Sequence, residues 1–472
     1  MASWRLLVVL VTVGLPLVCL ARYDDSKFGI FIHWGVFSVP SYSCGGVAAE
    51  WYWNGLETGA GNGCIQAFHN KTYGPNFKYA DFAKGFSAEL FDAARWANLF
   101  KKSGAKYVVL TSKHHEGFTN WPSPQSWNWN SADVGPGQDN VGLVTEAVRA
   151  AGLRMGLYHS LFEWFNPLYV TDRSNNGSTT VYVDTILQPQ LHDIVNRYKP
   201  EIVRTALNPT TTSTGLGLNV MLHRLAFKIW ADGDWEMYDT YWKSKEFLAW
   251  LYNDSPVRDT VVTNDRWGKD DSCKHGGYWT CTDRYNPGVL QEHKWENCFT
   301  IDSRTWGYAR NGGIGDYQTI DQLLQELIST VACNGNFLLN VGPTSDGIIT
   351  PVYEERLLQI GTWLDFNGEA IYATKPWRSQ NDTASSVWYT APKWSNSTAY
   401  AIFYAWPAES VLRLTQVVPQ SPNMVAQLLG YRGNLAWKLN GNTLAIVLPE
   451  IAHLPPLLQV QTAFTIKLVG VQ

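Results

Sequence analysis

The sequence is poor in charge and has no basic stretch. Of its 472 residues only 17% are charged, 37 Lys and Arg against 41 Asp and Glu, for a formal net charge of −4. A nucleic-acid-binding protein would carry a cationic surface, so we expect no nucleic-acid partner. We do not expect a disordered chain either, because 45% of the residues are hydrophobic and disorder requires low hydrophobicity with a large net charge.

Several catalytic signatures are also missing. The chain has no Gly-x-Ser-x-Gly turn, no His-Glu-x-x-His helix and no glycine-rich phosphate loop, which disfavours an esterase, a zinc protease or a nucleotide-binding enzyme. It has no Cys-x-x-Cys pair, so the usual zinc-ligand spacing is absent. No apolar run reaches the about 18 residues of a membrane-spanning helix, and we expect no membrane insertion.

The N-terminus has the layout of a secretory signal. Arg5 precedes the apolar run from Leu6 to Leu17, and Cys19 and Ala21 supply small residues for cleavage after Ala21. We therefore expect a signal peptide over residues 1–21 and a protein that enters the secretory pathway.

The cysteines and glycosylation motifs agree with that compartment. Six cysteines remain after the signal, and six allow 15 pairings. Cys273 and Cys281 are our preferred short-range disulfide. Sequons that predict N-glycosylation start at Asn70, Asn176, Asn381 and Asn396.

Aromatic residues are abundant, with 23 Trp, 23 Tyr and 19 Phe. Core packing accounts for most of these rings, but it does not ordinarily need so many tryptophans. Flat aromatic faces in polar surroundings suit sugars, since a sugar stacks its C–H face on a ring while its hydroxyls bind side chains. The composition therefore favours a carbohydrate ligand.

From Lys27 onward, short apolar β-type runs alternate with helical stretches, and several of these runs end in polar or reactive residues. Repeated β-then-α units imply parallel strands, and reactive residues at their C-terminal ends are typical of a (β/α)₈ barrel. We predict an α/β fold, with a (β/α)₈-like barrel over residues 22–375. After about Pro376 short strands follow one another without a helical period, which predicts an antiparallel β-sandwich over residues 376–472.

Two of these strand ends carry candidate chemistry. Asp232 follows an apolar strand and has aromatic neighbours, which suits a nucleophile on a glycosidic carbon; a second, protonated carboxyl group must then act as acid and base. A simple surface turn is the competing interpretation. His114-His115-Glu116 invites a metal site, but successive residues of an extended segment point to opposite sides, so hydrogen bonding to a substrate is the favoured interpretation.

At these motifs the sequence resembles the animal tissue α-L-fucosidases of glycoside hydrolase family 29. The motifs that carry the resemblance are Lys27 to Gly35, Glu50 to Trp53, Ser112 to Phe118, Gly156 to Ser160, Trp230 to Gly233, Asn264 to Gly268, Lys294 to Glu296, Asn340 to Pro343 and Thr465 to Gly470. They extend over nearly the whole chain after the signal.

The resemblance implies a retaining exo-glycosidase that releases terminal α-L-fucose from glycoproteins and glycolipids, lysosomal or secreted, often a homo-oligomer and without a metal or other cofactor. By motif position Asp232 matches the family nucleophile. Glu296 is our candidate acid/base, on what would be a variable loop, with Glu292 in reserve. The implied fucose pocket consists of His33, Glu50, Trp51, His114, His115, Tyr158, Trp230 and Arg266.

One departure from the family pattern bears on activity. About 25 residues, roughly 203–228, stand between Ile202 and the Ile229 strand, and family members lack them. Lys228 then begins the strand that leads to Asp232, where a buried ammonium group is costly unless it reaches solvent. The alternative to a working enzyme is therefore a catalytically impaired, lectin-like isoform that binds fucose.

Overall fold

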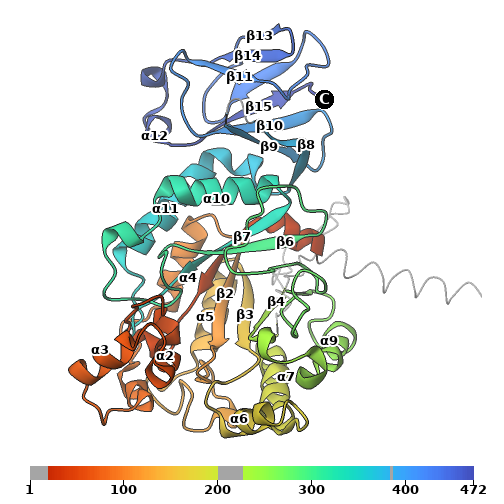
Figure 1. The fold of residues 1–472 in the computed structure, drawn as a ribbon. Coiled ribbons are helices and arrows are strands. Elements are labelled where there is room, and N and C mark those ends of the chain that lie inside the picture. Colours follow the sequence, from red (N-terminus) through yellow and green to blue (C-terminus); the bar gives the residue numbers. More distant parts are fainter. Residues whose placement is uncertain (1–19, 200–226, 383–385) are drawn as a thin grey trace, which may run out of the picture.

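The computed structural model describes residues 20–199, 227–382 and 386–472. Most of the predicted signal peptide, and the predicted insertion up to residue 226, lie outside these ranges. Figure 1 shows a lower α/β part and an upper β part, with helices α10 and α11 between them. Among the described residues no helix has the length and apolar character needed to cross a membrane.

The lower part contains a seven-stranded, all-parallel sheet in the order β5-β4-β3-β2-β1-β7-β6. Its strands are β1 (Phe28–Ile32), β2 (Tyr107–Lys113), β3 (Arg154–Ser160), β4 (Phe227–Asp232), β5 (Val261–Thr263), β6 (Trp295–Thr300) and β7 (Gly335–Val341). This is the barrel-like fold expected from the sequence, with seven strands rather than eight in the described residues.

An irregular segment stands where an eighth strand would close the barrel. Gly277 N–H donates to Thr263 O of β5 at 3.1 Å. On the other side Trp279 pairs with β6: its N–H donates to Lys294 O at 2.9 Å and its carbonyl accepts from Glu296 N at 2.8 Å. The segment 277–280 therefore bridges β5 and β6 through backbone hydrogen bonds without being a regular strand.

Helices cover the sheet where the sequence supplies caps and apolar faces. The Asp92 side chain caps α4 by accepting from Arg95 N at 2.9 Å, and Thr319 caps α10 with a capping box to Gln322. After a helical stretch over residues 20–26, the helices of this part are α2 (Tyr52–Thr58), α3 (Cys64–Thr72), α4 (Ala93–Lys102), α5 (Asn140–Ala150), α6 (Pro167–Ser174), α7 (Gln188–Arg197), α8 (Asp239–Trp242), α9 (Ser244–Asn253), α10 (Ile320–Ala332) and α11 (Pro351–Asn367).

The C-terminal part is antiparallel, as predicted, with one five-stranded sheet (β12-β15-β10-β9-β8) and one three-stranded sheet (β11-β14-β13). Its elements are β8 (Thr374–Asp382), β9 (Val387–Pro392), β10 (Thr398–Phe403), β11 (Val411–Leu414), β12 (Val425–Leu428), β13 (Trp437–Asn440), β14 (Thr443–Val447), α12 (Pro456–Gln459) and β15 (Phe464–Val469). Tyr400 and Ile402 of β10 belong to the same apolar core as the barrel, and Trp363 of α11 donates to Ala463 O at 2.9 Å. The two parts therefore share a packed contact.

Candidate active site

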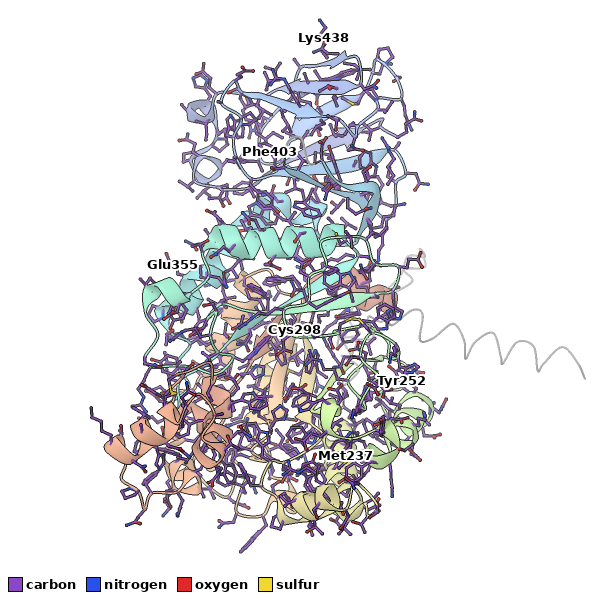
Figure 2. The ribbon with its side chains drawn as sticks, in the orientation of Figure 1. Met237, Tyr252, Cys298, Glu355, Phe403 and Lys438 are labelled. Carbon is purple, nitrogen blue, oxygen red and sulfur yellow. A yellow bond between two sulfur atoms is a disulfide. The ribbon has the colours of Figure 1, made fainter. Side chains whose placement is uncertain are left out.

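A pocket opens at the C-terminal ends of the parallel strands, the end at which barrels of this kind carry their active sites. It is lined by residues that follow or end several different strands: Phe31, His33, Glu50, Trp51, His114, His115, Tyr158, Trp230, Asp232, Trp235, Arg266, Asp283, Cys298 and Trp306. The structure thus brings together Asp232 and all eight residues of the implied fucose pocket. Cys298 marks the β6 wall in Figure 2.

Asp232 ends β4 and is held by hydrogen bonds to both carboxylate oxygens. Tyr158 OH donates to Oδ2 at 2.8 Å and Arg266 Nη1 donates to Oδ1 at 3.0 Å. His115 Nε2 lies 3.5 Å from Oδ2. The residue is only 9% exposed, so the carboxylate is fixed in orientation rather than free to rotate.

Arg266 binds a second pocket carboxylate as well. Its Nη2 donates to Asp283 Oδ1 at 2.7 Å, and its Nε donates to Thr280 Oγ1 at 3.1 Å. The guanidinium also lies over the Trp230 ring, 4.8 Å from its centroid. Arg266 is therefore a forked bridge between Asp232 and Asp283.

Three histidines line the pocket, each anchored through Nδ1. The partners are Asn340 Oδ1 for His33 (2.7 Å), Glu116 Oε2 for His114 (3.2 Å) and Ser160 Oγ for His115 (2.7 Å). Asn340 and Ser160 use their own donors elsewhere, on Trp306 O and Phe162 O. The three Nδ1 atoms therefore carry the hydrogen. The Nε2 atoms of His33 and His114 are left as acceptors for sugar hydroxyls, whereas Nε2 of His115 faces Asp232 Oδ2.

Burial keeps two of these imidazoles neutral. Desolvation, helped by the neighbouring His114, lowers the pKa of His33 to about 3 and that of His115 well below its usual value. Both rings therefore stay uncharged at weakly acidic pH and retain their acceptor nitrogens.

The expectation that His114 and His115 point to opposite sides is wrong. Strand β2 ends at Lys113, and a turn follows in which Gly117 N–H donates to His114 O at 3.1 Å. The turn breaks the alternation of an extended strand, and both rings line the pocket with centroids 4.2 Å apart. In the described part of the chain no three His, Cys, Asp or Glu side chains converge in a geometry that would hold a metal ion.

Glu50 contributes a buried acceptor to the pocket wall. Its Oε2 accepts from Thr305 Oγ1 at 2.8 Å, Trp306 N at 3.1 Å and Gly307 N at 2.9 Å. Its Oε1 has no hydrogen-bond partner among the described residues. A buried carboxylate oxygen without a partner is costly, and a ligand hydroxyl would satisfy it.

Aromatic rings form the remaining walls. Phe31, Tyr158 and Trp230 pack on one another with centroids 5.4 to 5.8 Å apart and are almost completely buried. Trp51 packs against Trp164 at 4.9 Å. The pocket therefore combines apolar surfaces with fixed hydroxyl partners, which is the combination that the amino-acid composition suggested for a sugar.

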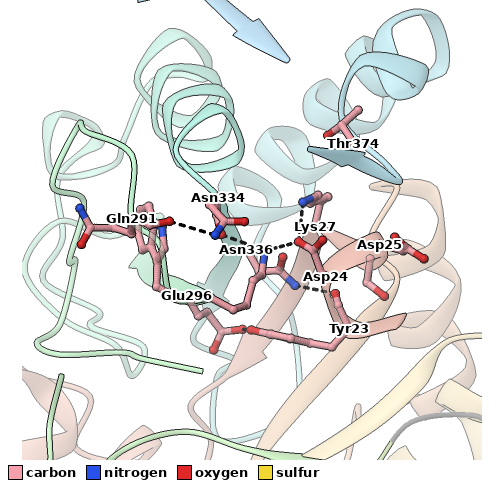
Figure 3. A network of polar contacts seen from close by, with 12 residues as sticks. Tyr23, Asp24, Asp25, Lys27, Gln291, Glu296, Asn334, Asn336 and Thr374 are labelled. Atoms are coloured by element: carbon pink, nitrogen blue, oxygen red, sulfur yellow. Dashed lines mark hydrogen bonds and ion pairs between the residues drawn. The ribbon is translucent and has the colours of Figure 1, made fainter. Parts of the chain in front are cut away.

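Glu296 does not reach this pocket. The expectation that it lies on a variable loop is wrong: it lies on β6 and is fully buried. Its carboxylate accepts from Tyr23 OH at 2.5 Å, Tyr107 OH at 2.8 Å and Trp230 Nε1 at 3.2 Å, and Figure 3 shows the bond to Tyr23. Glu292 lies elsewhere, in a surface depression beside Asp24 and Lys294.

Lys228 explains the burial of Glu296. Its Nζ lies 2.5 Å from Glu296 Oε2, and the ammonium is also 4.7 to 5.0 Å from the ring centroids of Tyr23, Tyr107 and Tyr278. The side chain is 4% exposed. Lys228 therefore does not extend to solvent but is neutralised inside the barrel.

Asp283 is the pocket carboxylate that the sequence reasoning missed. Its side chain is 53% exposed, in contrast to Asp232, and it lies on the connection between β5 and β6. The Cys273–Cys281 disulfide in that connection confirms the predicted pairing. Asp265 accepts from the backbone N–H groups of Cys273, Thr280 and Cys281. The carboxylate thus follows a disulfide-closed loop, and no motif in the sequence marks it as a pocket residue.

The other cysteines and the sequons also have defined places. Cys44 and Cys64 form a second disulfide, and Cys298 and Cys333 are buried free thiols. The four sequon asparagines, Asn70, Asn176, Asn381 and Asn396, are exposed. Their glycosylation remains a prediction.

Comparison with known proteins is decisive for the family. A family model described as alpha-L-fucosidase matches residues 18–211 and 224–369, and one described as the alpha-L-fucosidase C-terminal domain matches residues 380–469. The chain belongs to the α-L-fucosidases of glycoside hydrolase family 29. The break in the match, 212–223, falls within the predicted insertion.

Individual α-L-fucosidases are similar over nearly their full length. The alpha-L-fucosidase of Branchiostoma floridae is 49% identical over 95% of this chain and 92% of its own, and the tissue alpha-L-fucosidase of Homo sapiens is 47% identical over 96% and 89%. The crystal structure of the Thermotoga maritima alpha-fucosidase in complex with fucose is 31% identical, with a TM-score of 0.75 over 95% of this chain and 96% of that one.

Proposed function

We propose that this member of the family is a retaining exo-glycosidase that releases terminal α-L-fucose from glycoproteins and glycolipids by double displacement. The observation that carries the proposal is the bridge of Arg266 between two carboxylates of different exposure, Asp232 and Asp283, in one pocket. Retaining glycosidases need such a pair, one acting as nucleophile and the other as acid and base.

Asp232 is the proposed nucleophile. An oxygen of its carboxylate attacks the anomeric carbon of fucose while the bond from that carbon to the leaving oxygen breaks. Tyr158 OH and Arg266 fix the carboxylate for this attack. The product is a fucosyl ester of Asp232.

Asp283 is the proposed acid/base, in place of Glu296 and Glu292. In the first step its carboxyl proton passes to the leaving oxygen. In the second step its carboxylate takes a proton from water as that water attacks the anomeric carbon and the ester bond to Asp232 breaks. The exposed Asp283 side chain supports this role because both the leaving group and the incoming water must reach it.

The sugar hydroxyls are proposed to bind His33, Glu50, Trp51, His114 and His115, with Tyr158, Trp230 and Arg266 completing the pocket. The Nε2 atoms of His33 and His114 and the unpaired Glu50 Oε1 supply acceptors at fixed positions. Phe31 and Trp230 offer an apolar surface for the methyl group of fucose.

We further propose that the protein is lysosomal or secreted. Its relatives include proteins named tissue and plasma alpha-L-fucosidase, and the predicted signal peptide and exposed sequons agree with entry into the secretory pathway.

The test is release of the chromophore from an aryl α-L-fucoside by the purified protein, beside the Asp232→Gly variant. The expected result is turnover that is lost in the variant, with α-L-fucose as the first product seen by NMR. A β-configured first product would contradict retention. No turnover, combined with a rise in melting temperature on adding fucose, would identify the lectin-like alternative instead.

A further inference from the structure

Trp235 differs from the other aromatic residues of the pocket in its exposure. Phe31, Tyr158 and Trp230 are at most 2% exposed, and Trp51 and Trp306 are half-buried, whereas Trp235 is 43% exposed although it lines the same pocket. An exposed tryptophan beside a binding site is informative, because indole rings of soluble proteins are usually highly buried. Trp235 therefore belongs to the rim rather than the floor.

The ring is held firmly by its neighbours. It lies nearly perpendicular to the rings of His115 and Phe162, at interplanar angles of 84° and with centroids 5.4 Å away in both cases. It lies nearly parallel to Trp51, at 20° and 6.4 Å. Its indole N–H has no hydrogen-bond partner among the described residues. The Trp235 ring is thus fixed in orientation and partly open to solvent, and its indole N–H is free to donate to a ligand.

The backbone fixes the position of the Trp235 ring relative to Asp232. Trp235 follows Asp232 by three residues, through Gly233 at φ +85° and a short 3₁₀ turn, η6 (Asp234–Glu236). A Cβ on Gly233 would lie 2.8 Å from Phe162 Cδ1, so only glycine fits there. The carboxylate and the indole are therefore the two ends of one rigid turn, the first in the pocket and the second at its rim.

We infer that Trp235 is the stacking platform for the leaving group, which is a neutral pyranose ring linked to the terminal fucose before cleavage. This inference rests on the proposed function. When fucose occupies the buried part of the pocket, the rest of the bound glycan extends across the rim. There Trp235 presents a flat apolar surface and an indole N–H that has no other partner.

The charge at the rim favours a neutral leaving sugar. The Arg266 guanidinium is already shared between Asp232 and Asp283, and Asp283 is exposed at the pocket. A sulfated or acidic sugar would find no free cation among the pocket-lining residues with which to pair. A neutral ring needs no such partner and gains the stacking contact.

The experiment compares two substrates that share fucose and differ in the leaving group. α-L-Fucosyl fluoride has no sugar on the leaving side, whereas a fucosyl-N-acetylglucosamine disaccharide has one. In Trp235→Ala the ratio of kcat/KM for the disaccharide to that for the fluoride is expected to fall about tenfold, because an aromatic contact of about 1.4 kcal/mol is lost. Trp235→Phe keeps a ring and is expected to retain most of the ratio.

Trp127→Ala is the matched control, since Trp127 is 83% exposed and does not line the pocket. Its ratio is expected to equal that of the unmodified protein. Equal losses on both substrates in Trp235→Ala, or no loss on either, would overturn the inference.

A binding measurement separates this inference from the proposed function. If the unmodified protein fails to hydrolyse the fluoride, the proposed function fails, and calorimetry with free fucose and with the disaccharide then tests Trp235 alone. Trp235→Ala is expected to weaken disaccharide binding relative to fucose. The inference about Trp235 would be refuted if the variant lost affinity for fucose and for the disaccharide equally. It would also be refuted if the unmodified protein bound the disaccharide no more tightly than fucose.

Discussion

Lys228 and Glu296 form an ion pair inside the barrel, behind the pocket floor, with Nζ 2.5 Å from Oε2 and side chains 4% and 0% exposed. Glu296 in turn binds the indole N–H of Trp230, a residue of that floor. The pair therefore connects the start of β4 to the surface on which the sugar is proposed to rest.

Removing the lysine alone should destabilise the fold strongly. Lys228→Met leaves the Glu296 carboxylate buried without its cation, and breaking a buried pair costs about 3–5 kcal/mol. The double variant Lys228→Met with Glu296→Gln should recover part of this loss, because no buried charge is left. Urea unfolding gives both values.

Lys245→Met serves as the control for that experiment. Its side chain is 79% exposed and pairs with Asp239 at the surface, where a pair contributes about 0–1 kcal/mol. A Lys228→Met protein as stable as this control would contradict a buried, paired lysine.

Variants of Asp283 and of Glu296 should differ in their effect on kcat/KM. Asp283→Asn should lower kcat/KM for a fucosyl disaccharide by about 10²–10⁴-fold and much less for an aryl fucoside, whose leaving group needs little protonation. Glu296→Gln should keep the ratio between the two substrates and the shape of the pH profile. The opposite pattern would return the acid/base role to Glu296.

Asp234 should make stability depend on pH. Burial raises its pKa to about 6, with a smaller contribution from the Asp232 charge. A raised carboxyl pKa contributes stability that is present below about pH 4 and lost as the pH rises through about 6. Relative to Asp234→Asn, the unmodified protein should therefore lose about 2 kcal/mol between pH 4 and pH 7.

Unfolding free energies of both proteins at pH 4, 5, 6 and 7 would test this, since the other carboxyl groups titrate in both and cancel in the difference. A constant difference across the range would show that Asp234 does not titrate there.

The Cys273–Cys281 bridge should matter more for catalysis than for global stability. It closes a loop of eight residues in the connection that carries Asp283, and a loop of that size contributes about 2–3 kcal/mol. Replacing both cysteines by serine should lower kcat/KM for a disaccharide even at temperatures where the protein is fully folded by circular dichroism. An unchanged kcat/KM would show that Asp265 and the backbone alone position the loop.

The regular part of the fold could be predicted because its signals are local. The alternation of apolar runs and helical stretches predicted the parallel sheet, and the apolar run before Asp232 placed this residue at the end of a strand, β4. The absence of a regular eighth strand could not be predicted from the sequence. The backbone of segment 277–280 pairs with β5 and β6, and this pairing depends on those strands rather than on the residue pattern of the segment itself.

The position of Glu296 could not be predicted for a similar reason. Its burial depends on Lys228, 68 positions away in the sequence, and on Tyr23, 273 positions away. A motif with a carboxylate beside a tryptophan looks the same whether it lines a pocket or pairs with a lysine in a barrel. Asp283 had no motif at all, and only the folded loop brings it to Arg266.

The shared guanidinium has one more consequence. When Asp232 becomes an ester it loses its negative charge. In the same step Asp283 gives up its proton and becomes negatively charged. The second step reverses both changes. Arg266 therefore faces a single net negative charge before, between and after the two displacements, so neither step requires the surrounding dipoles to reorient around a new total charge.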